Sequence, residues 1–322
     1  MKDGSQNIIN LYVRANENKE KIVKKDLPRS YSVAEITVLS CMDALFRHDM
    51  YSCYDDNWDV NKVIKMILLD SLRGKMDCLD GKDKYSNIIR QMDNPEVKES
   101  RLARISVLNT IMGFKDENKD LNNLLNKQLK LQTTIRQGHI YWGAKGKRLE
   151  SILEHIYGTL ILALGIESEH DYCIDFDKIF KMLLIHETEE ITIGDLTEWD
   201  GVSPEEKIKL GKEAVKKIFK NTKNKDYYIN LLDEFNSHDT MESQYSHLCD
   251  KLEYDMQVKM YELQGRYDFE HRPDNVVTRS QRVRQIIEDG ASSVFDVHYE
   301  YDKDKYYSFP CLRRVLEETK NL

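Results

Sequence analysis

Hydrophobic residues recur along the chain at the spacing of α-helices. In the segment 149–166, LESILEHIYGTLILALGI, leucine and isoleucine return every three or four residues, which predicts an amphipathic helix. The segment 175–191 is apolar around most of its circumference, so we expect this helix in the core. Two further helices are predicted at 203–219 and 243–265.

Local signals mark the ends of two of these helices. Ser203 and Pro204 suit the N-cap and first position of a helix, and Gly265 suits its termination. The chain holds only five prolines, and strand-like alternation bounded by turn residues is hard to find. The sequence therefore predicts an all-α protein.

One apolar helical pattern occurs twice. The segment 59–70, DVNKVIKMILLD, aligns without a gap with 175–186, DFDKIFKMLLIH, and 32–36 aligns with 151–155 at a slightly larger offset. This similarity predicts a duplicated helical unit. Chance similarity between two amphipathic helices is the alternative.

The two copies differ in their polar residues. Histidine and glutamate appear only in the second copy, at four pairs of matched positions: Ile36 and His155, Asp70 and His186, Ser71 and Glu187, Gly74 and Glu190. The difference favours a functional site in the second copy. We predict a degenerate unit without metal ligands at 1–125, and a catalytic unit with a C-terminal extension at 126–322.

Histidines together with carboxylates suit a divalent metal ion such as Mn²⁺, Co²⁺, Fe²⁺, Zn²⁺ or Mg²⁺. His186 and Glu190 are four residues apart and share a helix face. Glu187 points about 100° away on an ideal helix. His186 and Glu187 could therefore bind one ion only near a helix end, and a simple solvated helix end is the alternative interpretation.

Four short blocks occur in a fixed order, namely RQG at 136–138, ESILEH at 150–155, HETEEITIGDLTEWDG at 186–201 and CDKLEYD at 249–255. Their order and spacing resemble the HD-domain metal-dependent phosphohydrolases, most closely the branch that contains the 5′-deoxynucleotidases. The resemblance covers about residues 126–265 and implies an all-α fold with metal ligands on three helices. The implied ligands are His155, His186, Glu187 and Asp250.

The resemblance also implies roles for other residues. Glu190 and Asp195 would orient the attacking water or take its proton, and Arg136 would contact the phosphate. His139 and Trp142 would lie in the region that lines the nucleotide pocket of the family.

Two positions depart from the family pattern. The histidine–aspartate pair that names the family is His186–Glu187 here, and glutamate, one methylene longer, can still bind a metal. The aromatic residue that usually follows the glycine of R-x-G is replaced by His139, with Trp142 three residues further on. Glu189 is left as the solvated carboxylate of its segment.

The resemblance implies an enzyme that hydrolyses nucleoside 5′-monophosphates with metal-activated water. Two alternatives remain open: a phosphodiesterase or hydrolase of a signalling nucleotide, and a non-catalytic regulatory protein that binds metal and nucleotide. Intact Glu190 and Asp195 favour catalysis, because a binding protein does not need these carboxylates. The degenerate first unit would replace the second subunit of a family dimer and make the chain a pseudo-dimer.

Charge and composition narrow the range of partners. The net charge of −8 gives no general attraction to nucleic acids or anionic membranes. No window has the roughly 18 apolar residues of a membrane span, and the first residues lack the apolar core of a signal peptide. Six scattered cysteines without a CxxC pair are typical of reduced thiols. We expect a cytoplasmic protein that binds a nucleotide or another small phosphate ester, and no chemistry is assigned to the tail at 270–322.

Overall fold

The described part of the chain is helical, as the sequence predicts. The computed structural model describes residues 4–23, 30–51, 58–80, 95–113, 118–197 and 199–322. Within these ranges no β-strand occurs, and two isolated β-bridges are the only strand-like pairings. The predicted all-α fold is confirmed.

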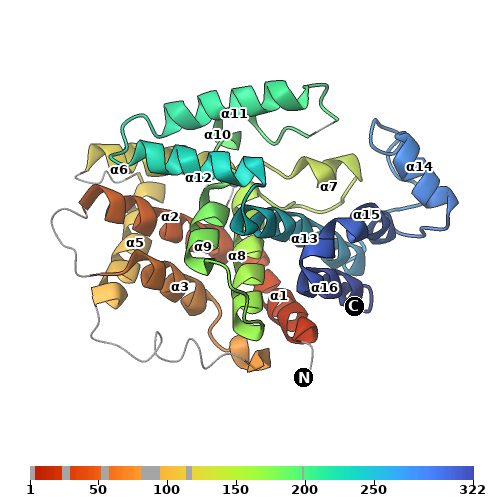
Figure 1. Cartoon of the computed structure of the whole chain (residues 1–322), viewed down its shortest axis with the longest axis horizontal. Helices are drawn as coiled ribbons and strands as arrows, with labels where there is room; N and C mark the ends of the chain where they lie inside the picture. The colour runs from red at the N-terminus through yellow and green to blue at the C-terminus, as the bar shows by residue number, and fades with distance from the viewer. Residues whose placement is uncertain (1–3, 24–29, 52–57, 81–94, 114–117, 198) are drawn as a thin grey trace.

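The helices before residue 129 form one end of the molecule in Figure 1, except for α1 and the short η1, which lie beneath the centre. Residues of α1 pack against α8 and α16. The elements are α1 (Ser5–Glu20), α2 (Val33–Tyr51), α3 (Val60–Ser71), η1 (Met76–Cys78), α5 (Pro95–Ile111) and α6 (Lys119–Gln128).

The remaining helices form the centre and the opposite end. The central elements are η3 (Leu129–Gln132), α7 (Gln137–Tyr141), α8 (Ile152–Glu169), α9 (Phe176–Ile185), α10 (Glu190–Ile193), α11 (Pro204–Ile218), α12 (Lys225–Ser237) and α13 (Met241–Leu263). The C-terminal extension adds α14 (Gln281–Glu288), α15 (Val294–Asp302), η4 (Lys303–Ser308) and α16 (Pro310–Thr319). The predicted helices at 149–166, 203–219 and 243–265 correspond to α8, α11 and α13 within a few residues.

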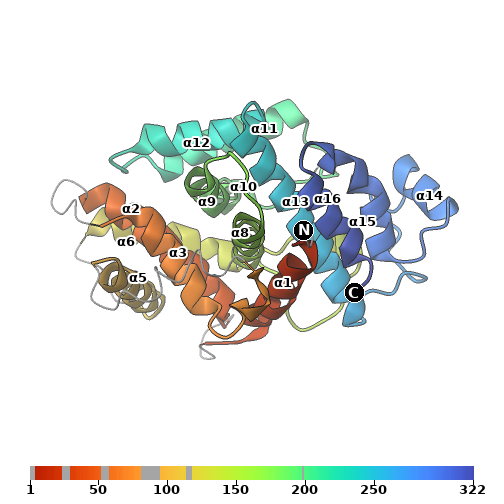
Figure 2. The same cartoon turned by 60° about the horizontal axis from the view of Figure 1, so that its bottom comes forward.

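Helix α8 is the central element of the fold. Nearly all of its residues are buried, and it packs against α1, α2, α9 and α13. Figure 2 shows it between the N-terminal helices on one side and α13 on the other. Buried residues from both parts of the chain join one continuous hydrophobic core, so the first 125 residues share their core with the rest.

The predicted helix at 175–191 is shorter in the structure. Helix α9 ends at Ile185, residues 186–189 form turns, and a new short helix, α10, begins at Glu190. The His186 ring bonds to the carbonyl oxygen of Leu183 through Nδ1, at 2.7 Å. Because of this break, the polar residues that follow Ile185 do not continue the helix and do not lie on one helical face.

Helices α2 and α8, which carry matched segments of the proposed repeat, begin with the same capping arrangement. Ser32 and Glu35 form a capping box at the start of α2, and Ser151 and Glu154 form one at the start of α8. The two boxes touch, since Ser151 Oγ donates to Glu35 Oε1 at 2.7 Å. Arg148 Nη2 lies 2.9 Å from Glu35 Oε2 and 2.6 Å from Glu154 Oε1.

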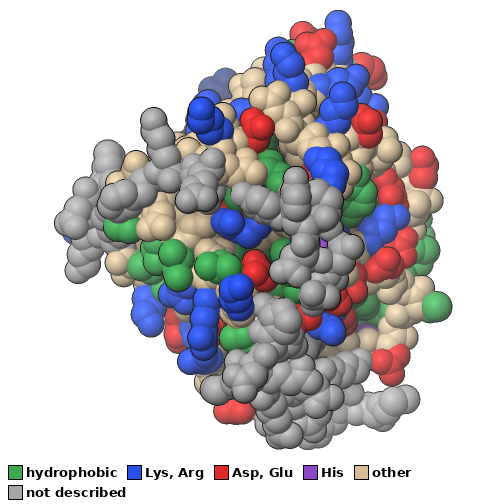
Figure 3. Space-filling view, turned by 90° about the vertical axis from the view of Figure 1, so that its left-hand side faces the viewer, with side chains coloured by type: hydrophobic (Ala, Val, Ile, Leu, Met, Phe, Trp, Pro, Cys, Tyr) green, Lys and Arg blue, Asp and Glu red, His purple; other side chains and the backbone are tan. Residues whose placement is uncertain are grey.

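The surface carries charges of both signs. On the face shown in Figure 3, the acidic and basic side chains of the described residues are intermingled. None of the described helices combines the length and the apolar character of a transmembrane span. The five described cysteines are free thiols, whereas Cys53 lies outside the described residues.

The burial of α8 predicts a large stability loss when its core side chains are shortened. Leu160 is fully buried, so Leu160→Ala should lower the free energy of unfolding by about 2–5 kcal/mol. Leu263→Ala, at a leucine that is 53% exposed, is the matched control and should change it by about 0.5 kcal/mol or less. Urea unfolding measures both, and equal effects would contradict the central position of α8.

Candidate metal centre

Four side chains with metal-binding atoms converge where α8, α9 and α13 meet. His155 comes from α8, His186 and Glu187 directly follow α9, and Asp250 comes from α13. One donor atom of each lies within 4.8 Å of the other three. The structure thus brings together all four ligands that the family resemblance implies.

The tautomer of His186 leaves a nitrogen available for a metal. Nδ1 donates to the Leu183 carbonyl at 2.7 Å, so the lone pair is on Nε2. Nε2 has no hydrogen-bond partner among the described residues. It lies 3.5 Å from Glu187 Oε1 and 3.8 Å from Asp250 Oδ1, and it is therefore directed into the cluster of donors.

His155 is held in the arrangement common for metal-binding histidines, with a carboxylate behind the ring. Its Nδ1 lies 2.5 Å from Glu253 Oε2, and its Nε2 lies 2.8 Å from Asp250 Oδ1. Burial and the nearby guanidinium of Arg136 lower the pKa of His155, but the two carboxylates outweigh them and raise it to about 9. A metal ion would compete for Nε2 with the proton shared with Asp250.

Two imidazoles and two carboxylates fit a divalent ion of the first transition series. Burial raises the pKa of the Glu187 carboxyl, but His186 and Arg136 outweigh it and the pKa is lowered. Burial likewise opposes ionisation of Asp250, but the hydrogen bond to His155 and the charge of Arg136 hold its pKa well below its usual range. Both carboxylates are therefore in the charged form that binds a cation.

Arg136 lies against the candidate ligands, immediately before α7. Its Nη1 is 2.8 Å from Glu187 Oε1, and its Nη2 is 3.4 Å from Asp250 Oδ1. Burial alone would lower the pKa of Arg136, but the surrounding carboxylates raise it by more than burial lowers it. The guanidinium therefore stays charged. The glycine of the R-x-G block is explained by packing, since a Cβ at Gly138 would lie 2.2 Å from the hydroxyl oxygen of Tyr254.

The two predicted water-handling carboxylates lie beside this cluster in different environments. Asp195 Oδ2 accepts the backbone N–H of Gln137 at 2.7 Å, and its Oδ1 is 3.9 Å from Arg136 Nη1. Glu190 is buried. Burial, together with the charges of Glu187 and Asp195, raises the pKa of Glu190 well above its usual value, which favours the protonated carboxyl.

Glu189 differs from its expected position in solvent. It is half-buried, and its carboxylate packs against the backbone of α11, where a Cβ at Gly211 would lie 2.3 Å from Glu189 Oε2. Burial, with the charge of Glu187, raises the pKa of Glu189 to about 7. The break between α9 and α10 is the reason, because it turns this side chain towards α11.

A cavity of about 450 Å³ opens beside the cluster. Its wall includes Arg136, Trp142, Asp195 and Asp250, and residues of the C-terminal extension complete it. The extension thus lies at the site, although the sequence assigned it no chemistry. Its contributions are Val277, Arg282, Val283, Val297, His298, Tyr301, Asp302 and Lys305.

His139, predicted in the substrate pocket, lies behind the cavity wall in this structure. Its side chain is fully buried, and both ring nitrogens are engaged, with Tyr267 Oη at 2.7 Å and Glu150 Oε2 at 3.1 Å. It belongs to a buried polar network and not to the cavity surface. Trp142, by contrast, does line the cavity.

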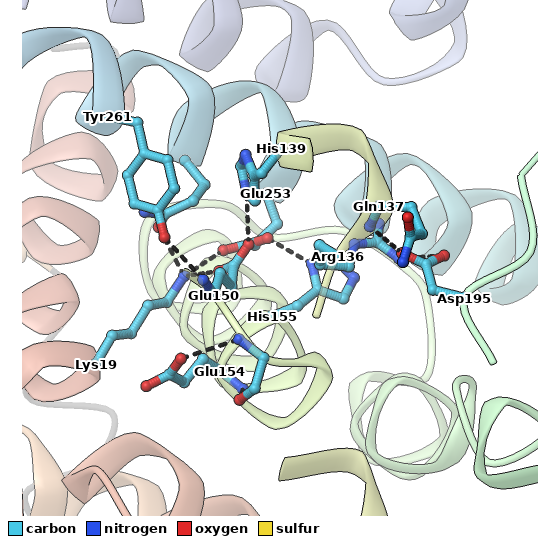
Figure 4. A network of polar contacts seen from close by, with 12 residues as sticks. Lys19, Arg136, Gln137, His139, Glu150, Glu154, His155, Asp195, Glu253 and Tyr261 are labelled. Carbon is cyan, nitrogen blue, oxygen red and sulfur yellow. Dashed lines mark hydrogen bonds and ion pairs between the residues drawn. The ribbon is translucent and has the colours of Figure 1, made fainter. Parts of the chain in front are cut away.

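The buried network supports the candidate ligand His155 from behind (Figure 4). Lys19 of α1 places its ammonium 2.6 Å from Glu150 Oε1 and 2.6 Å from Glu253 Oε1. Glu253 in turn contacts His155. Glu253 passes close to the backbone of α8, where a Cβ at Gly158 would lie 2.1 Å from its Oε1.

Sequence reasoning missed this network. A lysine in a polar helix is usually solvated, and the carboxylates that bury Lys19 are 131 and 234 residues away along the chain. The ES-x-x-EH and CDKLE blocks contain Glu150 and Glu253, so these blocks hold supporting residues as well as candidate ligands.

Comparisons with known proteins identify the family of the chain. The HD-domain family matches residues 129–289, half of the chain, and the chain belongs to this family. The human 5′-deoxynucleotidase HDDC2 is 27% identical over 146 residues, which are 44% of this chain and 66% of that protein. The chain thus spans just under two thirds of that relative's length.

Two further similarities were found. The 5′-deoxynucleotidase hdd1 of Schizosaccharomyces pombe is 29% identical over 147 residues, which are 44% of this chain and 71% of that protein. A solved structure of a conserved hypothetical protein from Pyrococcus furiosus is 23% identical, with a TM-score of 0.44, and the match covers 62% of this chain and 99% of that one.

The network around Lys19 predicts a coupled loss of stability and metal affinity. Lys19→Met keeps the side-chain length but leaves Glu150 and Glu253 without their cation, which should cost about 3–5 kcal/mol of unfolding free energy. Because Glu253 would no longer be fixed against His155, Mn²⁺ affinity should fall about 10–100-fold. Urea unfolding and titration calorimetry measure the two effects.

Lys21→Met is the matched control, since Lys21 is exposed two residues further along. It should leave both quantities close to those of the wild type. Unchanged Mn²⁺ affinity in a folded Lys19→Met protein would show that the network does not support the metal centre.

Proposed function

We propose that this chain is a divalent-metal-dependent phosphohydrolase that acts on nucleoside 5′-monophosphates. The observation that carries the proposal is the convergence of His155, His186, Glu187 and Asp250 within 4.8 Å, with the Nε2 lone pair of His186 directed into the cluster. The names of the two 5′-deoxynucleotidase relatives support the substrate class.

The residues around the cluster suit phosphate ester hydrolysis. When bound, a divalent cation supplies Lewis acidity that polarises a phosphoryl oxygen and acidifies water. Arg136, whose guanidinium lies at the border of the cluster and the cavity, would bind the phosphate through its planar set of donors. Asp195 is held by a backbone N–H and would orient the water.

Glu190 is suited to proton transfer. Its raised pKa favours a protonated carboxyl, which could act as the general acid of the reaction. The cavity beside the cluster, about 450 Å³ with Trp142 and Tyr254 in its wall, would take the nucleoside. Aromatic faces of this kind stack on bases.

We propose further that residues 1–125 are a degenerate copy of the helical unit in residues 126–322, which also contain a C-terminal extension, and that only the second copy holds candidate metal ligands. The matched starts of α2 and α8, with capping boxes that touch each other, support this proposal. In a two-fold arrangement the same segment of each copy contacts its counterpart, and the starts of α2 and α8 are in such contact here.

The proposed reaction predicts phosphate release that depends on the cluster. In the presence of Mn²⁺ or Co²⁺, the protein should release phosphate from at least one nucleoside 5′-monophosphate, and His186→Ala should abolish this release because it removes a ligand. A colorimetric phosphate assay on a panel of ribo- and deoxyribonucleotides measures the effect. His271→Ala, at an exposed histidine, is the control and should retain activity.

No phosphate release from any monophosphate would contradict the proposed substrate class. If such a protein still binds Mn²⁺, the alternatives are a diester substrate or a non-catalytic sensor, and bis(p-nitrophenyl) phosphate would distinguish them.

The role of Glu190 predicts a defect in turnover. Glu190→Gln keeps the size of the side chain but removes its titrating proton, so kcat should fall about 10²–10⁴-fold. Binding of Mn²⁺ should persist, because Glu190 is not among the candidate ligands. Glu189→Gln is the matched control at the neighbouring position and should retain most of the activity, so equal losses in the two variants would refute a specific role for Glu190.

A further inference from the structure

A second group of metal-binding side chains lies at the wall of the same cavity, with His298 and Asp302 in the lining and Asp255 behind them. His298 and Asp302 are four residues apart on α15 and so lie on one helix face, and Asp255 comes from the adjacent helix α13. One donor atom of each lies within 4.8 Å of the other two. The group shares no residue with the first cluster.

One donor atom of this group is buried without a partner. Asp255 is fully buried and Asp302 is 7% exposed. Asp255 Oδ1, the oxygen that lies nearest His298 Nδ1, has no hydrogen-bond partner among the described residues. Buried polar atoms are normally paired, so unpaired ones point to a missing ligand.

The spacing of the donors resembles that of the first cluster. His298 Nδ1 lies 3.8 Å from Asp255 Oδ1, too far for a hydrogen bond. The corresponding distances from His186 Nε2 to its carboxylates are 3.5 and 3.8 Å. Two donors bound to one metal at the tetrahedral angle are about 3.3–3.6 Å apart, so a small closure would suffice.

The surroundings fix these side chains and their charges. Tyr306 Oη donates to Asp255 Oδ2 at 3.0 Å, and the His298 ring packs edge-on against Trp142 and Tyr254. Burial lowers the pKa of His298 to about 4, so the imidazole is neutral and can donate a lone pair. Burial and the charge of Asp302 raise the pKa of Asp255, which a bound cation would reverse.

One protein cation is already close to this group. The ammonium of Lys305 pairs with Asp302 Oδ1, which compensates one of the two carboxylates and shows that this oxygen attracts positive charge. The Lys305 side chain is 35% exposed and can move into solvent when another cation arrives.

We propose that Asp255, His298 and Asp302 form a second divalent-cation site, located where the C-terminal extension closes the cavity. A set of two carboxylates and one imidazole suits Mn²⁺, Fe²⁺, Co²⁺ or Zn²⁺ better than Ca²⁺, which prefers six to eight oxygen ligands. The site stands independently of the proposed hydrolase activity, because it rests only on the donors of α13 and α15.

Counting bound metal tests the proposal. The full chain is dialysed to equilibrium against Mn²⁺, and the metal bound per chain is measured. Wild type should bind two equivalents, and His298→Ala and Asp302→Asn should each bind one. Asp304→Asn, the same change at an exposed position on the adjoining turn, is the matched control and should keep two.

His186→Ala separates the two sites, because it should lose the first equivalent and keep the one bound by the second group. If the first cluster bound no metal, the wild type would bind one equivalent at the second group. His298→Ala and Asp302→Asn would then each lose that equivalent. Circular dichroism checks that each variant is folded. A wild-type chain whose bound metal is unchanged by both His298→Ala and Asp302→Asn, or that binds no metal, would overturn the second site.

Discussion

Compensation of negative charge inside an apolar core is the constraint on which this structure depends. Around α8, buried carboxylates from α13 and from the segments before α8 and after α9 meet within a few ångströms of one another. An uncompensated buried charge costs several kcal/mol, about as much as a typical protein's entire margin of stability. Lys19 and Arg136 supply the compensating charge, and both come from segments distant in sequence from most of their partners.

Because of this constraint, the site depends on residues outside the segment that matches the family. The matched segment, residues 129–289, contains the four candidate ligands, but Lys19 precedes it. The end of α15 and η4, which complete the cavity wall, follow it. A fragment limited to the matched segment would therefore lack both the cation behind His155 and one side of the cavity.

Much of the fold could be predicted from the sequence, because helix α8 and its neighbours have strong apolar periodicity. The ligand set came from family resemblance, since neither His155 nor Asp250 is distinguished by the apolar pattern of its own helix. The break after Ile185 was missed because the apolar run continues into polar residues that also favour helix. Lys19 was missed for a different reason: local patterns carry no information about partners that lie more than a hundred residues away.

Gly158 shows how the supporting network constrains the central helix. A glycine inside a helix costs about 1 kcal/mol relative to alanine, and replacing such glycines is a common way to make a protein more heat-resistant. Because Gly158 has no side chain, Glu253 has the room to contact both Lys19 and His155. Helix propensity and site geometry thus oppose each other at this position. A carboxylate in the position of Glu253 therefore requires glycine at position 158. A relative with a larger residue there must support the histidine that corresponds to His155 in another way.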